Sequence, residues 1–186
     1  MSQEVFNTAN SLDTCYKYES ETLMDRLNDV RRVVTGHNDD GKAIFKDDQK
    51  FETKLIPSGE AEFTLIWTAP DLPVDNNDET DGRLRDAGLT LNGGSVIRVV
   101  DMLPGKESPF HRTNSLDYGI VMCGELELEL DDGQKTLLGP GDIVIQRGTI
   151  HLWRNPSENE VCRIIFILTE ATAAEVNGKP LPEKHP

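Results

Sequence analysis

The stretch Glu-Leu-Glu-Leu-Glu-Leu, residues 125–130, alternates charged and apolar side chains without a break. Because successive side chains of a β-strand point to opposite faces, this alternation predicts a strand whose leucines face a core and whose glutamates face water. The next residues, Asp131, Asp132 and Gly133, are typical of a tight turn into a second strand. The stretch therefore predicts a β-sheet with one buried face.

Further β-prone segments surround this stretch, with turn residues between them. They are Ser95–Asp101, Tyr118–Leu130, Gln134–Leu138, Asp142–Gln146, His151–Arg154 and Val161–Leu168. Short strands that follow one another at this spacing predict an all-β sandwich or barrel.

The N-terminal part of the chain is more polar. Residues 1–30 predict a loose arm with one short helix over Ser20–Val30, where leucines recur at helical spacing. A β-hairpin is predicted from Arg31–Thr35 and Lys42–Lys46, a strand from Phe63–Thr68, and an acidic loop from residues 69–86. A single domain over residues 31–169 and a C-terminal tail over 170–186 complete the expected organisation.

Composition excludes several classes of function. The 186 residues suffice for one domain with a sizeable core. A net charge of -14 with no basic patch argues against binding to nucleic acid. No apolar run is long enough for a membrane helix, and the first residues do not resemble a secretory signal, so we expect a cytoplasmic protein without membrane contact. The three cysteines are widely spaced, which predicts reduced thiols and no zinc-thiolate site.

Two histidines follow glycine- or proline-containing turns, and the residues around them match a known spacing. The first set is Gly105, five residues, His111, Arg112, Thr113, three residues, Asp117, six residues, Gly124. The second set is Gly148, two residues, His151, three residues, Asn155.

These two sets resemble the two sequence motifs of the cupins. In the second motif Gln146 stands where a proline is expected. Gly141 lies one residue closer to that position than the spacing of the motif requires. The motifs cover residues 105–155, and the flanking strands extend the resemblance to about residues 31–169. The chain further resembles a group of small stand-alone microbial cupins that are often encoded beside metabolic gene clusters.

The resemblance implies a double-stranded β-helix, or jelly-roll barrel, with a site in its mouth. Cupins bind a metal there with two early histidines, a glutamate and a late histidine. In this chain His111 and His151 match ligand positions, Asp117 replaces the glutamate, and Thr113 replaces the second histidine. The resemblance thus implies either no cofactor or one weakly bound divalent metal, Fe, Mn or Zn, on His111, Asp117 and His151.

Strand alternation adds candidate substrate-binding residues. Thr113 lies two residues from His111, and Trp153 two residues from His151, so each pair shares a face. Arg98 and Arg163 could receive a substrate carboxylate or phenolate if they point inward, or could lie on the outer face.

These residues favour an enzyme that transforms a small carbonyl- or carboxylate-bearing metabolite without net oxidation. In decarboxylation, dehydration or isomerisation, His111 or His151 would move a proton, Asp117 would orient the histidine, and Thr113 or an arginine would hold the oxyanion. Two alternatives stay open: an iron or manganese dioxygenase, and a cupin that binds a small ligand without turnover. The resemblance also implies a homodimer.

Overall fold

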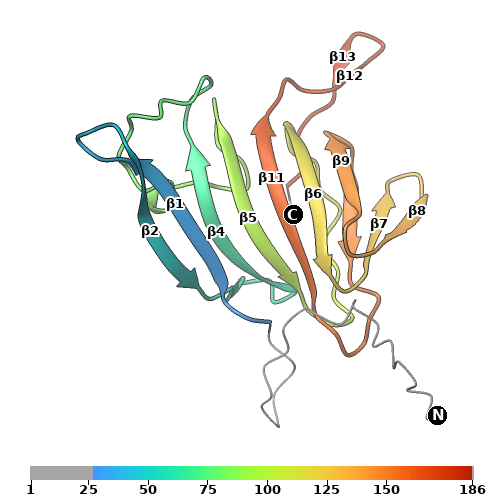
Figure 1. Cartoon of the computed structure of the whole chain (residues 1–186). Coiled ribbons are helices and arrows are strands. Elements are labelled where there is room, and N and C mark those ends of the chain that lie inside the picture. The colour runs from blue at the N-terminus through green and yellow to red at the C-terminus, as the bar shows by residue number, and fades with distance from the viewer. Residues whose placement is uncertain (1–26, 186) are drawn as a thin grey trace, which may run out of the picture.

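Two antiparallel sheets form the body of the molecule (Figure 1). The computed structural model describes residues 27–185. The six-stranded sheet has the order β3 (Lys54–Leu55), β4 (Ala61–Ala69), β5 (Ser95–Met102), β11 (Cys162–Glu170), β6 (Ser115–Cys123) and β9 (Ile143–Arg147). The three-stranded sheet has the order β10 (His151–Arg154), β7 (Leu126–Leu130) and β8 (Lys135–Leu138). This is the predicted all-β barrel.

The core lies between these two sheets. Leu126 and Leu128 of β7 are buried in one cluster with Val100, Val121 and Ile164 of the larger sheet. The glutamates between the leucines are less buried, as the alternation in the sequence predicts. Burial of these aliphatic side chains, at roughly 25 cal/mol per Å² of apolar surface removed from water, holds the sheets together.

One predicted strand is two strands in the structure. The segment Tyr118–Leu130 breaks at Gly124, which has a φ of 74° and sends the chain from β6 in the large sheet to β7 in the small one. A Cβ at this position would lie 2.9 Å from the Cα of Cys162. Glycine is therefore required both for the backbone angle and for the close approach of the two segments.

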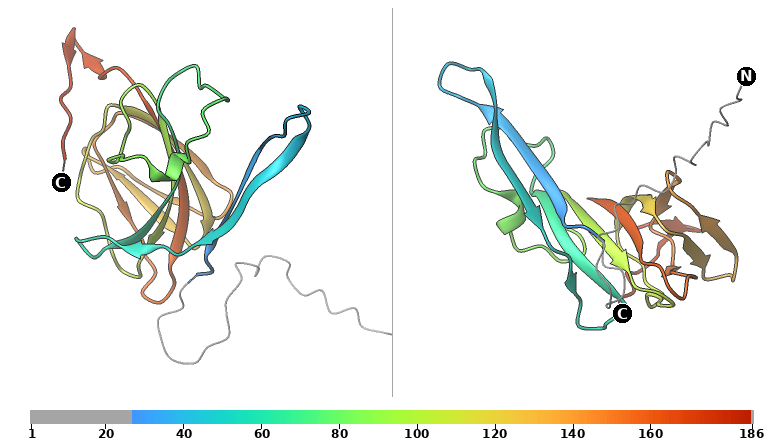
Figure 2. Two further views of the ribbon diagram at one scale, coloured as in Figure 1. Left: turned by 90° about the vertical axis from the view of Figure 1, so that its left-hand side faces the viewer. Right: turned by 60° about the horizontal axis from the view of Figure 1, so that its bottom comes forward.

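The hairpin of β1 (Val30–His37) and β2 (Ala43–Phe51) forms a separate two-stranded sheet that extends away from the barrel (Figure 2). Arg32 connects it to the rest of the molecule. Its guanidinium is buried, pairs with Asp47 and Asp81 at 2.6 and 2.7 Å, and lies over the rings of Phe51 and Trp67. These contacts join the hairpin to the loop before β5.

The ends of the chain agree with the predictions only in part. The expected helix at Ser20–Val30 falls largely on residues 1–26, outside the described residues, and Val30 already begins β1. The C-terminal tail forms the small ladder β12 (Glu175–Val176) and β13 (Lys179–Pro180). It then returns to the barrel, where Lys184 and Arg112 exchange backbone hydrogen bonds of 2.8 and 3.0 Å. Within residues 27–185, no helix has the length and apolarity that crossing a membrane requires.

Candidate functional site

Two histidines face each other at one end of the barrel. The backbone N–H of His111 donates to the carbonyl of His151 at 3.0 Å, and the N–H of His151 donates to the carbonyl of His111 at 3.1 Å. Residues paired in this way across an antiparallel ladder carry their side chains on the same face. The two imidazole rings accordingly lie with centroids 4.3 Å apart. The motif spacing in the sequence therefore brings together the pair that it predicts.

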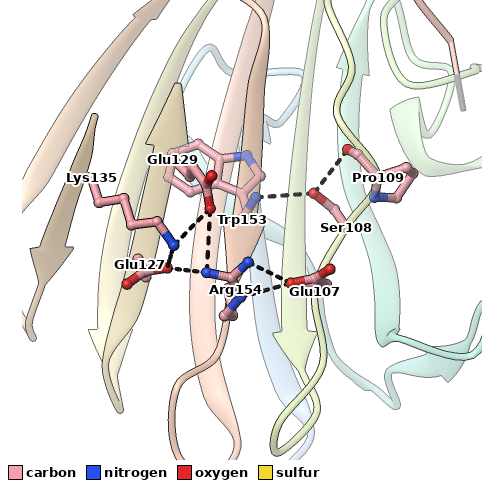
Figure 3. Close-up of polar contacts among 8 residues, drawn as sticks. All are labelled: Glu107, Ser108, Pro109, Glu127, Glu129, Lys135, Trp153 and Arg154. Atoms are coloured by element: carbon pink, nitrogen blue, oxygen red, sulfur yellow. Dashed lines mark hydrogen bonds and ion pairs between the residues drawn. The ribbon is translucent and has the colours of Figure 1, made fainter. Parts of the chain in front are cut away.

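The segment that carries His111 lies along β10 and is held there by polar contacts (Figure 3). Ser108 donates its N–H to the carbonyl of Trp153 at 2.8 Å, and its hydroxyl accepts from the N–H of Trp153 at 3.0 Å. Glu107 pairs with Arg154 at 2.6 Å. Because these contacts join the segment before His111 to β10, the His111 and His151 rings are held in a defined relative position.

Arg154 is itself part of a network of charged groups on the outer face of the small sheet (Figure 3). It contacts Glu127 and Glu129 of β7, and Lys135 of β8 contacts the same two carboxylates. The glutamates that alternate with the core leucines thus link β7, β8 and β10 to the segment before His111.

The proton of neutral His111 is placed by its backbone. Nδ1 of His111 lies 2.9 Å from the carbonyl oxygen of Pro109. A carbonyl oxygen only accepts hydrogen bonds, so Nδ1 must donate. Nε2 of His111 is then the unprotonated nitrogen, with a lone pair that can accept a proton.

Nδ1 of His151 lies between a hydrogen-bond donor and an acceptor. Gln146 Nε2 donates to the carbonyl of Thr149 at 2.8 Å, and Gln146 Oε1 accepts from the Thr149 hydroxyl at 2.9 Å, which sets the orientation of the amide. Gln146 Nε2 lies 2.8 Å from Nδ1 of His151, and the Thr149 carbonyl oxygen lies 3.0 Å from the same nitrogen. The amide pairs with the tautomer that carries its proton on Nε2, and the carbonyl pairs with the tautomer that carries it on Nδ1, so these contacts are compatible with both.

Both histidines are neutral near pH 7. Burial lowers the pKa of His151 to about 4, with a further lowering by His111 and an opposing effect of the Thr149 carbonyl. Burial also lowers the pKa of His111, against the raising effect of the Pro109 carbonyl. The unprotonated Nε2 of His111 thus lies beside a second neutral imidazole.

The histidines line a cavity of about 90 Å³ inside the barrel. Its lining is mostly apolar and comes from both sheets and from the loop before β5. The apolar side chains are Ala61, Phe63, Leu89, Val100, Met102, Trp153, Phe166 and Leu168. Such a lining, with a few convergent polar groups, is typical of a small-molecule site.

Asp117 is a buried acidic group of this cavity. Its side chain is buried, with 5% of the residue exposed, and Oδ1 has no hydrogen-bond partner. Burial raises the pKa of Asp117 to about 6, although a hydrogen bond from Ser115 and the charge of Arg98 both lower it. Ser115 in turn lies 2.7 Å from the hydroxyl of Thr113. Asp117 is therefore a carboxylate whose proton affinity is unusually close to neutral pH.

Most of the predicted site residues meet in this cavity. His111, His151, Asp117, Thr113, Trp153 and Arg98 all line it.

Arg163 does not line the cavity, and its position does not support the predicted contact with substrate. It lies on the outer face of β11, where it makes a bidentate pair with Asp101 at 2.7 Å. The alternation in β11 puts Ile164 in the core and Arg163 on the opposite face.

The predicted role of Asp117 as the group that orients a histidine also has no support in the contacts. The Pro109 carbonyl and Gln146 contact the two rings instead.

The residues present do not fit the metal site that the sequence motifs imply. Among the described residues, no group of three or more His, Cys, Asp or Glu side chains is placed to hold a metal ion. Thr113, at the position of the missing histidine, has its hydroxyl engaged with Ser115. The chemistry derived below therefore uses only the side chains of this chain.

A second, larger hollow of about 690 Å³ lies between the β1–β2 hairpin and the acidic loop 70–81. Several of its carboxylates are already paired with cations. Asp81 pairs with Arg32, Asp78 with Arg85, and Glu79 with Lys46. The pairs with Arg32 and Lys46 attach the loop to the hairpin, so we place the functional site in the smaller cavity with the two histidines.

Several residues that support the site from other strands are not predicted from the sequence. Gln146 departs from the cupin motif, and its amide contacts Nδ1 of His151. Ser115 occupies the same face as Thr113 and Asp117, and strand alternation could have identified it. Phe63 and Phe166 reach the cavity only because the barrel closes, and no local pattern indicates this.

Comparisons with known proteins identify the family of this chain. A family model described as a cupin domain matches residues 98–168. Phomopsin biosynthesis cluster protein C' of Diaporthe leptostromiformis is 38% identical over 83% of this chain and 86% of its own length. Oryzines biosynthesis cluster protein J of Aspergillus oryzae is 38% identical over 83% of this chain and 90% of its own length.

Another relative is named for a class of activity. The cupin-domain-containing oxidoreductase fogC of Aspergillus ruber is 36% identical over 83% of this chain and 79% of its own length. Among solved structures, the polyketide cyclase RemF of Streptomyces resistomycificus is similar, with 20% identity and a TM-score of 0.43 over 67% of this chain and 70% of that chain.

Proposed function

This chain belongs to the cupin family, and from that membership we propose that it is a small-molecule enzyme that moves protons on a carbonyl compound without net oxidation. The observation that carries the proposal is the pair of neutral histidines, with ring centroids 4.3 Å apart, in an apolar cavity. In the proposal His151 takes the tautomer whose Nδ1 accepts from Gln146, so that His111 supplies a base and His151 a hydrogen-bond donor. This combination promotes the enolisation of a carbonyl compound.

In the proposed reaction His151 Nε2–H donates a hydrogen bond to the substrate carbonyl oxygen. His111 Nε2 removes a proton from the neighbouring carbon, and the C–H electron pair forms the C=C bond of an enolate. The negative charge develops on the oxygen that faces His151, which stabilises it. Return of the proton to a different carbon of a conjugated enolate gives isomerisation. If the enolate carries a β-hydroxyl group, the C–O bond breaks and the hydroxyl leaves as water with the proton that His111 had taken, which gives dehydration.

The surroundings support a role for the pair in chemistry. Gln146 and the Pro109 carbonyl hold both rings by their Nδ1 atoms, so neither has to reorient during proton transfer. The apolar lining lowers the local dielectric, which strengthens the hydrogen bond to a developing oxyanion. A cavity of about 90 Å³ takes a short carbonyl fragment, and the remainder of a larger substrate would extend outside the barrel.

The test is hydrogen–deuterium exchange at the carbon beside the carbonyl, followed by NMR in D₂O over a panel of small ketones, aldehydes and keto acids. We expect the wild-type protein to accelerate exchange for at least one compound. The His111→Gln and His151→Gln variants should each lose roughly 10²–10⁴-fold in rate, the usual contribution of a positioned acid or base.

A folded His111→Gln variant that exchanges as fast as the wild type would contradict the proposal. Saturable binding by the wild type without exchange would favour a cupin that only binds its ligand, because both histidines would then be dispensable for chemistry.

The names of four relatives favour a second candidate, an oxidoreductase. Such an activity needs an electron acceptor or donor from outside the chain, whereas proton transfer needs none. Oxygen consumption, or a change in absorbance of an added nicotinamide cofactor, during turnover would identify this candidate. Equal turnover under air and under argon without added cofactor would exclude it.

A further inference from the structure

The cavity contains two buried polar atoms that have no partner. Among the described residues, Oδ1 of Asp117 and Nε of Arg98 are each buried without a hydrogen bond. One is an acceptor and the other a donor. A buried polar group left unpaired costs about 1–3 kcal/mol, so two of them in one cavity require an explanation.

Strand register places both residues on the cavity side of the large sheet. Arg98 of β5 lies opposite Phe166 of β11, and Asp117 of β6 lies opposite Leu168 of the same strand. β5 and β6 flank β11 on its two sides. All four side chains line the cavity, so the unpaired donor and acceptor lie on one wall around Phe166 and Leu168.

Other polar atoms of both residues make hydrogen bonds that hold the side chains in place. Arg98 Nη2 donates to the carbonyls of Gly88 and Leu89 at 2.6 and 2.8 Å. Asp117 accepts a hydrogen bond from Ser115, whose hydroxyl also contacts Thr113. The unpaired donor and acceptor are therefore preorganised. A ligand that hydrogen-bonds to both requires little rearrangement of the two side chains.

The charges of the two residues decide what can occupy this wall. An incoming carboxylate would meet the Asp117 carboxylate in an apolar surrounding, which is unfavourable for two like charges. An incoming ammonium would meet Arg98 in the same way. A neutral hydroxyl group avoids both conflicts, because its O–H can donate to Asp117 Oδ1 while its oxygen accepts from Arg98 Nε.

We propose that Asp117 and Arg98 form a subsite for a hydroxyl group, so that the enzyme acts on neutral hydroxy-carbonyl compounds. This inference rests on the proposed function, since it takes the histidine pair as the place where the carbonyl binds. It narrows the substrate from carbonyl compounds in general to those with a second, neutral oxygen. It also replaces the expectation that Arg98 binds a carboxylate.

The test compares ligands that differ by one hydroxyl group. The probes are 2-butanone, 3-hydroxy-2-butanone and 4-hydroxy-2-butanone, titrated into the full-length protein and followed by the indole N–H signal of Trp153, which lines the cavity. The chain has two tryptophans, so the signal that remains in a Trp67→Phe variant identifies it. We expect at least one hydroxy ketone to bind about tenfold tighter than 2-butanone, or better, as hydrogen bonds to charged groups imply.

Two variants remove the subsite while preserving bulk. Arg98→Met and Asp117→Leu should each abolish the preference for the hydroxy ketone over 2-butanone. The control is Arg147→Met, on an exposed residue at the end of β9 that does not line the cavity, which should keep the full preference.

Equal affinities of all three probes for the wild type would overturn the inference, as would failure of both hydroxy ketones to shift the Trp153 signal. These outcomes are independent of the proposed function. Loss of exchange in His111→Gln without any hydroxyl preference would refute only the subsite, whereas a hydroxyl preference with unchanged exchange in His111→Gln would refute only the proton transfer.

Discussion

At the scale of single residues, the site depends on where three protons lie. The carbonyl of Pro109 keeps one on Nδ1 of His111, and the proposed reaction places one on Nε2 of His151, with Nδ1 accepting from Gln146. The third belongs to Asp117, whose buried carboxyl has a raised pKa of about 6. Each assignment follows from a specific neighbour, so each can be changed by one substitution.

Gln146→Glu should reverse the tautomer of His151. A carboxylate in place of the amide accepts from Nδ1–H, which moves the ring proton away from Nε2 and raises the pKa of His151 above its present value of about 4. We expect exchange on the carbonyl substrate to slow by about tenfold or more, since the donor to the oxyanion is lost. An NMR titration of the His151 ring measures the pKa, and an unchanged value would contradict the assignment.

Asp117→Asn should change how stability depends on pH. The native state keeps the Asp117 proton up to a pH of about 6, whereas the unfolded chain releases it near 3.8. Between these values the native state binds more protons, so wild-type stability falls as pH rises, by a total of about 3 kcal/mol. Asparagine does not titrate, so the Asp117→Asn variant lacks this contribution to the pH dependence of stability.

The free energy of unfolding of Asp117→Asn relative to wild type should therefore increase from pH about 4 to pH about 7, by up to the same ~3 kcal/mol. Urea unfolding of both proteins at the two pH values measures it. His151, whose lowered pKa destabilises the native state as pH falls, acts in both proteins and cancels in the difference. A difference that does not vary with pH would show that Asp117 titrates normally.

At the scale of elements, the site is made by two segments that pair across the barrel end. His111 lies just before β6 and His151 begins β10, and the two strands belong to different sheets. What joins them is the ladder through Ser108 and Trp153 and the ion pairs of Arg154 (Figure 3). The site also depends on Gly124, because the chain passes there from β6 in the large sheet to β7 in the small sheet.

Gly124→Ala should destabilise the protein more than Gly133→Ala. Both glycines have positive φ, 74° and 83°, so both substitutions bring backbone strain of about 1 kcal/mol. Only at Gly124 would the new Cβ approach within 2.9 Å of Cys162 and Val161, whereas it would meet nothing within 4 Å at Gly133. Thermal unfolding should show a lower Tm for Gly124→Ala, and equal Tm values would contradict the close packing at this turn.

The sequence predicted individual strands better than their arrangement. The alternation of Leu126 and Leu128 identified the buried face of β7 correctly, because that pattern is local. The break at Gly124 was missed, since β-prone residues continue on both sides of it. Motif spacing and alternation identified His111 and its neighbours in the cavity. They did not decide the face of Arg163, because alternation gives two possible faces and only the packed barrel selects one.

At the scale of the whole molecule, the barrel leaves apolar side chains uncovered. On the outer face of β6 and β9, Tyr118, Met122, Ile143 and Ile145 are exposed, with 62% of Ile143 accessible. Adjacent exposed apolar side chains on a sheet mark an interaction surface. This face is the candidate contact for the homodimer, which remains a prediction from the family resemblance.

Ile143→Lys should then separate the two copies. A lysine on each copy would put an unpaired charge into the apolar contact, which disfavours association. Multi-angle light scattering should show a dimer for the wild type and a monomer for the variant, with Lys135→Gln, on the other sheet, as a dimeric control. A wild-type monomer, unchanged on deletion of residues 1–28, would contradict the homodimer.

The proposed proton transfer requires two neutral histidines of opposite tautomer that face one another in the cavity. Long-range ¹H–¹⁵N correlation spectra of the imidazoles at pH about 7 determine the tautomers, with His111→Gln and His151→Gln to assign the signals. We expect two neutral rings, with the proton on Nδ1 of His111 and on Nε2 of His151. Two rings with the same tautomer, or a doubly protonated ring at this pH, would contradict it.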